Sequence, residues 1–232
     1  MGDFLQTEPA LDWRAVAAVI DHTLLAPDTA AGEIEQLCRE AAHFGFAAVA
    51  IQPGWVALAA SLLHDTPVRV CAAIGFPHGA TTTSVKRFEA AEALRLGADE
   101  LDMVMNIGAL KSGDRERVQA DIAGVAEVTR AGGGILKVIL ETSRLTNEEK
   151  AVACQIAVAA GADFVKTSTG YADGGATVED VALMRKVVGN RAGVKASGGI
   201  RSAAQVAALL RAGADRIGSS ASVGIMGELG AR

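Results

Sequence analysis

The chain has 232 residues, of which 50% are hydrophobic and 21% are charged, and its formal net charge is −5. This composition excludes a disordered chain. The net negative charge gives no general electrostatic reason to bind nucleic acid or an anionic membrane. The length fits one large domain or two small ones.

Residues 9–19 are expected to form a short N-terminal helix, and after it eight short apolar runs alternate with longer amphipathic stretches. Most of the runs are apolar at both odd and even positions and rich in Val and Ile, which is typical of parallel strands covered on both faces. We expect strands over residues 19–23, 46–52, 68–75, 100–106, 135–141, 164–168, 193–197 and 216–219. We expect helices over residues 29–44, 83–96, 114–131, 147–160, 178–188 and 202–212, and a short final helix after Ser220.

A Gly-Ala-Asp motif precedes three of the predicted strands, at residues 97–99, 161–163 and 213–215. A glycine at such a place allows the left-handed conformation that ends a helix, and Gly45 and Gly132 are expected to do the same. Eight strand–helix units without a linker favour a single (β/α)8 TIM barrel over residues 1–232, in the α/β class. Residues 1–18 would be the N-terminal helix and lead-in, and residues 226–232 a short tail. The alternative, an open doubly wound sheet, usually has fewer strands and a glycine fingerprint after the first one, which is absent here.

Four consecutive predicted strands contain a charged residue near their third position: Asp102, Lys137, Lys166 and Lys195. A buried parallel strand should exclude ionised side chains, because an unpaired buried charge is costly. Each could instead be a strand-end charge that reaches solvent, but four in neighbouring strands favour an interior cluster. The alternation of side chains would also turn Asn106, Glu141, Ser168 and Ser197 toward the mouth of the barrel, where active sites of this fold form.

Two neighbouring lysines and a carboxylate favour carbon–carbon bond chemistry through an imine and an enamine. A lysine attacks a carbonyl only when its amine is neutral, and its ordinary pKa prevents this at neutral pH. A second ammonium nearby and burial both lower that pKa. The carboxylate would then transfer a proton at the carbon next to the imine, alone or through a water molecule.

The loops after the last three predicted strands are rich in glycine and hydroxyl groups. They contain Ser168-Thr169-Gly170, Ser197-Gly198-Gly199 and Gly218-Ser219-Ser220. Barrels commonly hold a substrate phosphate with backbone N–H groups at this place. Ordinary turn geometry could also explain the glycines, but three neighbouring loops favour a phosphate site.

Several segments resemble the deoxyribose-phosphate aldolase family over about residues 21–222. They are Ile20-Asp-His-Thr-Leu-Leu25, Ile74-Gly-Phe-Pro-His-Gly-Ala80, the run from Glu100 to Gly113, Phe164-Val-Lys-Thr-Ser-Thr-Gly170 and Val194-Lys-Ala-Ser-Gly-Gly-Ile-Arg201. The resemblance implies a class I aldolase, a lyase without metal or cofactor. Such enzymes reversibly cleave 2-deoxy-D-ribose 5-phosphate to acetaldehyde and D-glyceraldehyde 3-phosphate, a step in deoxyribose catabolism.

The same resemblance implies a role for each matching residue. Lys166 would form the Schiff base, Lys195 would lower its pKa, and Asp102 would belong to the proton relay. Lys137 is expected to support Asp102 or to polarise substrate hydroxyls. The residues expected to meet the phosphate are Gly170, Gly198, Gly199, Gly218, Ser219 and Ser220.

The chain departs from the family pattern at Ala50, where relatives often carry cysteine, and at Ala221, where they often carry serine. The first departure removes a thiol near the pocket, and the second puts one phosphate donor in doubt. Tyr171 stands where the family varies.

Two other functions remain open from the residues alone. They are a phosphosugar isomerase or epimerase on the same barrel, and a non-catalytic phosphosugar-binding barrel. The three cysteines, widely spaced and without a metal-binding pattern, are interpreted as small buried hydrophobic residues. The first 13 residues lack a signal-peptide core, and no apolar run approaches the length of a membrane helix. We therefore expect a cytoplasmic protein without a membrane or nucleic-acid partner, possibly a homodimer.

Overall fold

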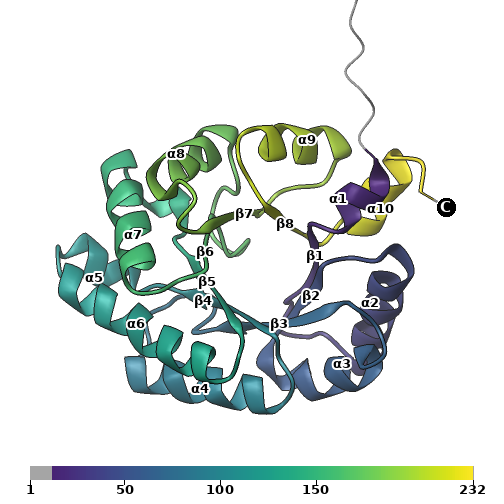
Figure 1. Ribbon diagram of the computed structural model, residues 1–232, viewed down its shortest axis with the longest axis horizontal. Coiled ribbons are helices and arrows are strands. Elements are labelled where there is room, and N and C mark those ends of the chain that lie inside the picture. The colour runs from purple at the N-terminus through teal and green to yellow at the C-terminus, as the bar shows by residue number, and fades with distance from the viewer. Residues whose placement is uncertain (1–11, 232) are drawn as a thin grey trace, which may run out of the picture.

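The computed structural model describes residues 12–231. Eight parallel strands pair in chain order, and β8 pairs with β1, so that the sheet closes into a barrel with the helices outside it (Figure 1). This confirms the expected (β/α)8 barrel. The strands are β1 (Ile20–Leu24), β2 (Ala48–Ile51), β3 (Arg69–Ile74), β4 (Glu100–Val104), β5 (Ile135–Ile139), β6 (Phe164–Lys166), β7 (Gly193–Ser197) and β8 (Arg216–Ser219).

All six long helices occur where the sequence predicts them. They are α2 (Ala31–Phe44), α4 (Thr83–Arg95), α6 (Arg115–Ala131), α7 (Asn147–Ala159), α8 (Val178–Val188) and α9 (Ala203–Arg211). The N-terminal helix is shorter than expected, α1 (Trp13–Ala17), and residues 9–11 of the prediction lie outside the described residues. Within residues 12–231, no helix is long and apolar enough to cross a membrane.

Two helices were not predicted, α3 (Val56–Leu63) and α5 (Ile107–Lys111), and neither were the 3-10 turns η1 (Pro53–Trp55) and η2 (Thr142–Arg144). Helix α3 is apolar along most of its length, and the other three elements are too short to show a helical period. The final helix, α10 (Ser222–Glu228), extends into the segment from residue 226 that was expected to be a tail.

The alternation of side chains along the strands separates two environments. Outward-facing residues such as Leu101, Met103 and Val194 join the apolar core between the barrel and the helices. The inward-facing residues include small ones, with Ala48, Ala50 and Cys71 forming a separate buried cluster. The interior also contains most of the buried charged side chains of the described residues: Asp21, Glu100, Asp102, Lys137, Lys166 and Lys195.

The first and the last residue of the repeated Gly-Ala-Asp motif each have a structural role. Its glycines are left-handed, with φ of 105° at Gly97, 91° at Gly161 and 109° at Gly213. Its aspartates each accept a hydrogen bond from the backbone N–H of a residue in the preceding strand, at Val70, Leu136 and Val194. The motif therefore ends a helix and fixes the register of the next strand.

One expectation about the glycines was wrong. Gly132 has φ −85°, and Gly133, the next residue, takes the left-handed conformation with φ 73°. With three glycines in a row, residues 132–134, any of them could accept the left-handed position.

A buried ion pair joins helices α4 and α6. Lys86 Nζ lies 2.5 Å from Asp121 Oδ2, and both side chains are buried. Asp121→Ala should lower the free energy of unfolding by about 3–5 kcal/mol, because it leaves a buried ammonium without its counter-charge. Urea denaturation measures the change.

Glu127→Ala is the matched control, because Glu127 also lies on α6 and pairs with Arg87 of α4, but at the surface. This variant should change the free energy of unfolding by less than about 1 kcal/mol. Equal effects of the two substitutions would contradict the distinction between the pairs.

Candidate active site

The four charged residues predicted to lie inside the barrel do so, but not in a single row. Asp102 pairs in register with Lys137, and Lys166 pairs with Lys195. Between the two pairs the register advances by two residues, because Lys137 lies opposite Phe164 and not opposite Lys166. This offset follows from the tilt of the strands in a closed barrel.

The side chains nevertheless meet at one carboxylate. Asp102 Oδ2 lies 2.6 Å from Lys166 Nζ and 2.7 Å from Lys195 Nζ, and Asp102 Oδ1 lies 2.9 Å from Lys137 Nζ. Because Lys166 and Lys195 share one oxygen atom, their nitrogens are separated by no more than the sum of the two distances. The structure thus brings together all three lysines and the aspartate.

The two lysines that share an oxygen differ in their pKa. Burial lowers the pKa of Lys166, and the ammonium of Lys195 lowers it further, against the attraction of Asp102. Burial also disfavours the charge on Lys195, but Asp102 and Asp21 outweigh it and raise the pKa of Lys195. Of the two lysines, Lys166 therefore loses its proton more readily, and Lys195 holds its proton more strongly.

Three further charged residues complete the network, and the sequence analysis did not single them out. Asp21 on β1 pairs with Lys195, and its other oxygen lies 2.7 Å from Arg216 Nη1. Glu100 lies 2.6 Å from Lys137 Nζ and 3.2 Å from Arg216 Nη2. All three occupy inward positions of their strands, so the rule that identified the lysines could have found them.

The network around Asp102 contains more cationic groups than carboxylates. Its cationic side chains are Lys137, Lys166, Lys195, Arg216 and the half-exposed Arg69, and its carboxylates are Asp21, Glu100 and Asp102. Loss of a proton from Lys166 would reduce this excess of positive charge. The three lysines hold the pKa of Asp102 well below its ordinary value, although burial alone would raise it.

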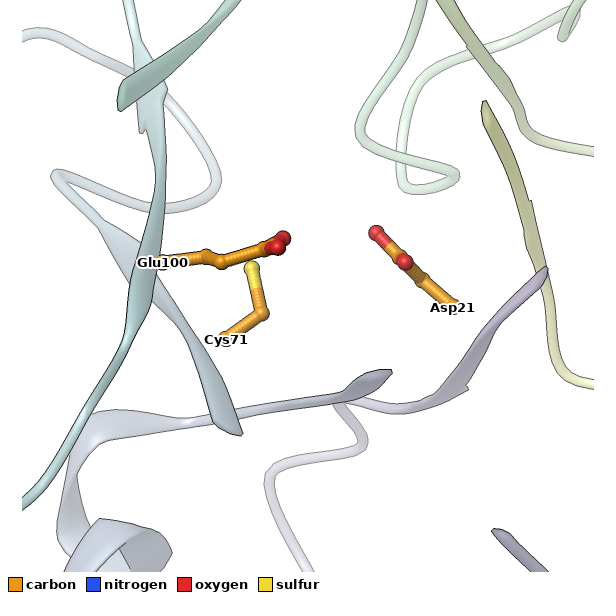
Figure 2. A group of neighbouring side chains, drawn as sticks. All are labelled: Asp21, Cys71 and Glu100. Carbon is orange, nitrogen blue, oxygen red and sulfur yellow. The ribbon is translucent and has the colours of Figure 1, made fainter. Parts of the chain in front are cut away.

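Among the described residues, Asp21, Cys71 and Glu100 have the spacing of a metal site, with ligand atoms within 4.8 Å of one another. Figure 2 shows the three side chains pointing toward one another inside the barrel. However, Lys137 Nζ lies 3.2 Å from the Cys71 sulfur and 2.6 Å from Glu100 Oε2. Burial also raises the pKa of Cys71 to about 12, so that the thiol is not a thiolate. The cation of this cluster is the ammonium of Lys137.

Cys71 lies next to Ala50, the position where relatives often carry cysteine. Ala50 lies opposite Cys71 in the β2–β3 register. The interior therefore contains a thiol on the neighbouring strand, and Cys71 contacts Lys137 as well as packing against small residues. The other two cysteines, Cys38 and Cys154, are free and buried, as expected.

A cavity of about 320 Å³ opens at the C-terminal ends of β6, β7, β8 and β1, where Lys166 forms part of its lining. All six residues expected to meet a phosphate line it: Gly170, Gly198, Gly199, Gly218, Ser219 and Ser220. Of the four residues expected to face the mouth, Ser197 lines this cavity, whereas Asn106 caps α5 by accepting from the N–H of Ala109. Arg201 also lines the cavity and was missed, although it stands at the end of the quoted glycine motif.

Two of these loop residues have other structural roles. A Cβ at Gly218 would lie 3.1 Å from Lys195 Cε, so this glycine leaves room for the lysine. The Ser219 hydroxyl donates to Ile200 O and accepts from Ala221 N, so it is already paired within the loop. In contrast, Gly170, Gly198 and Gly199 have left-handed φ of 85°, 93° and 75° and present backbone without a side chain.

Comparison with known proteins finds similarity to aldolases over nearly the whole chain. The family described as DeoC/LacD family aldolase matches residues 15–229. A deoxyribose-phosphate aldolase of Halalkalibacterium halodurans is 57% identical over 92% of this chain and 95% of the relative. One of Thermoanaerobacter sp. is 56% identical over 92% of this chain and 96% of the relative. A solved structure, described as a unique tetrameric structure of deoxyribose phosphate aldolase from Aeropyrum pernix, has a TM-score of 0.89 and 33% identity, covering 94% of this chain and 92% of that one.

The buried network predicts a specific acid dependence of stability. Lys195, Lys137 and Arg216 lower the pKa of Asp21 to about 2, against the effect of burial. A carboxyl group with a depressed pKa in the folded state contributes stability that is present above its ordinary pKa of 3.8 and is lost as the pH falls through about 2. Asp21→Asn should therefore lower the free energy of unfolding at pH 7 by about 2 kcal/mol or more.

Chemical denaturation at a series of pH values tests this. The difference between Asp21→Asn and the unchanged protein should stay constant down to about pH 5 and shrink toward about pH 2. A variant as stable as the unchanged protein at pH 7, or a difference independent of pH, would contradict the assignment.

Proposed function

The chain belongs to the DeoC/LacD family of aldolases, and we propose that it reversibly cleaves 2-deoxy-D-ribose 5-phosphate to acetaldehyde and D-glyceraldehyde 3-phosphate through a Schiff base on Lys166. The family confirms the aldolase class expected from the sequence. The observation that carries the proposed mechanism is the shared contact of Lys166 and Lys195 with one oxygen of Asp102.

Each step of the proposed reaction has a group in reach. The neutral amine of Lys166 attacks the C1 aldehyde, and loss of water leaves an iminium ion. Removal of the proton from the C3 hydroxyl then converts C3 into the aldehyde of D-glyceraldehyde 3-phosphate, which is released as the C2–C3 bond breaks. The electron pair of that bond moves toward the iminium and forms an enamine. Protonation of the enamine at C2 and hydrolysis release acetaldehyde and the free lysine.

We assign the remaining polar groups to support of this chemistry. Lys195 keeps the pKa of Lys166 low, and Asp102, held as a carboxylate, transfers protons directly or through a water molecule. Lys137 holds the second oxygen of Asp102 at 2.9 Å and so fixes its orientation. This reaction draws on no metal or organic cofactor, and we expect a chelator to leave the rate unchanged.

The cavity beside Lys166 supports binding of the substrate phosphate at its outer end. The left-handed glycines Gly170, Gly198 and Gly199 let an anion approach the backbone closely, and the guanidinium of Arg201 adds a positive charge. The hydroxyl of Ser219 already donates a hydrogen bond to Ile200 O, so only the main chain of Ser219 is free to bind the phosphate. Ser220 is exposed in the same loop.

The alternatives weighed from the sequence are less well supported. An isomerase or epimerase works with acid/base carboxylates and does not require two lysines that share one oxygen of Asp102. A binding barrel without catalysis gives no reason for a lysine with a lowered pKa at the cavity floor. A homodimer and a cytoplasmic location, both expected from the sequence, stay predictions.

Lys166→Met should abolish cleavage while the fold is retained, with a loss of roughly 10³-fold or more in kcat, because the variant has no nucleophile. Treatment of the unchanged protein with acetaldehyde and borohydride should add one ethyl group, located at Lys166 by peptide mass spectrometry. Lys186→Met, at an exposed position of α8, is the control and should cleave and label normally. Near-normal cleavage by Lys166→Met, or an unmodified mass, would refute the mechanism.

Lys195→Met should shift the rising limb of the pH–rate profile to higher pH. The neutral amine is the reactive form, its fraction increases with pH, and loss of the neighbouring ammonium raises the pKa of Lys166. The pH dependence of kcat/KM measures the shift, with Lys186→Met again as the control. A profile with a lower rate but an unchanged midpoint would show that Lys195 does not set this pKa.

A further inference from the structure

Glu141, two residues after the end of β5, has φ 57° and is the one residue other than glycine with a positive φ within residues 12–231. The backbone hydrogen bonds around it explain the conformation. Leu140 N donates to Lys166 O, and two residues later Thr142 N donates to Thr167 O. Between these two hydrogen bonds, the chain that follows β5 advances by two residues, from 140 to 142, whereas the chain that follows β6 advances by one, from 166 to 167. Glu141 is the extra residue of a β-bulge, a feature that redirects a side chain.

The redirected side chain of Glu141 is 4% exposed and holds the neighbouring loop. Its carboxylate accepts from the Thr169 hydroxyl at 2.5 Å and from Thr169 N at 3.3 Å. The same hydroxyl oxygen accepts from Tyr171 N at 3.0 Å. In the described part of the chain, every hydrogen bond of the Glu141 side chain goes to Thr169. Hydrogen bonds to an ionised carboxylate are stronger than neutral ones, so this chain of contacts fixes the turn that contains Gly170.

The turn separates two cavities. Thr169, Gly170 and Tyr171 line the cavity that contains Lys166. Thr169 and Tyr171 also line a second cavity of about 350 Å³, together with Glu141. The Tyr171 ring packs edge-on against Phe76, with centroids 5.4 Å apart. A shift of the turn would therefore move one wall of the substrate cavity.

We propose that Glu141 is a positioning residue, which holds the turn of residues 169–171 so that the backbone of Gly170 faces the phosphate end of the substrate cavity. This role rests on the proposed function for the identity of the ligand. Glu141 binds the turn and not the ammonium network around Asp102, so its loss should affect phosphate binding and not Schiff-base formation.

Glu141→Ala should raise KM for 2-deoxyribose 5-phosphate about tenfold and leave kcat within about twofold. Inhibition by inorganic phosphate should weaken by a similar factor, and amide hydrogen exchange in residues 169–171 should become faster. Trapping of acetaldehyde by borohydride should be unchanged, which separates the phosphate end from the reacting lysine.

Two matched variants make the test specific. Glu141→Gln keeps one acceptor oxygen and should fall between the alanine variant and the unchanged protein, and it serves if Glu141→Ala does not fold. Asp173→Asn removes the same charge from an exposed position of the same loop without removing these hydrogen bonds, and it should behave as the unchanged protein.

Three results would overturn the proposal: an unchanged KM and unchanged exchange in folded Glu141 variants, an equal rise of KM in Asp173→Asn, or a loss of acetaldehyde trapping parallel to the loss of cleavage. An unchanged protein that does not cleave the phosphorylated sugar would refute the proposed function instead. Amide exchange and phosphate binding would still decide the role of Glu141.

Discussion

The carboxylate of Asp102 is the interaction on which the interior of this barrel depends. Three lysine Nζ atoms from three different strands lie within 2.9 Å of its oxygens, in a space that most barrels of this fold fill with apolar side chains. Each buried lysine would be costly without a counter-charge, and one buried carboxylate without the lysines would be equally costly. The charges are therefore tolerated only as a set, and the set exists only when the barrel is closed.

Closure matters because the network extends around the ring. Asp21 on β1 pairs with Lys195 on β7 and with Arg216 on β8, so the contact between the first and last strands is electrostatic as well as hydrogen-bonded. Small residues make the room. Gly218 leaves space for the Lys195 side chain, and Ala48 and Ala50 are small inward-facing residues of β2. The same arrangement places Lys166, the lysine whose pKa is lowered, in the lining of the substrate cavity.

Much of the fold could be predicted because local patterns carry it. The apolar runs predicted all eight strands, and the glycines of the Gly-Ala-Asp motif marked the ends of three helices. The four charges in the strands could be found because each breaks an apolar pattern. Asp21, Glu100 and Arg216 break the same pattern but lie at or near strand ends, where a charge has an ordinary explanation. Their inward parity could have indicated them, but their pairing partners lie on strands distant in the sequence, and no local pattern shows which residues pair.

The sequence by itself determined the alternation of strands and helices, the inward parity of Asp102, Lys137, Lys166 and Lys195, and the family resemblance, because these depend on residue type and spacing along the chain. The tertiary structure decided which oxygen each lysine meets, the offset in register between Lys137 and Lys166, the engagement of the Ser219 hydroxyl and the bulge at Glu141. Those features depend on the tilt and closure of the barrel, which set distances between residues that the sequence separates by tens of positions.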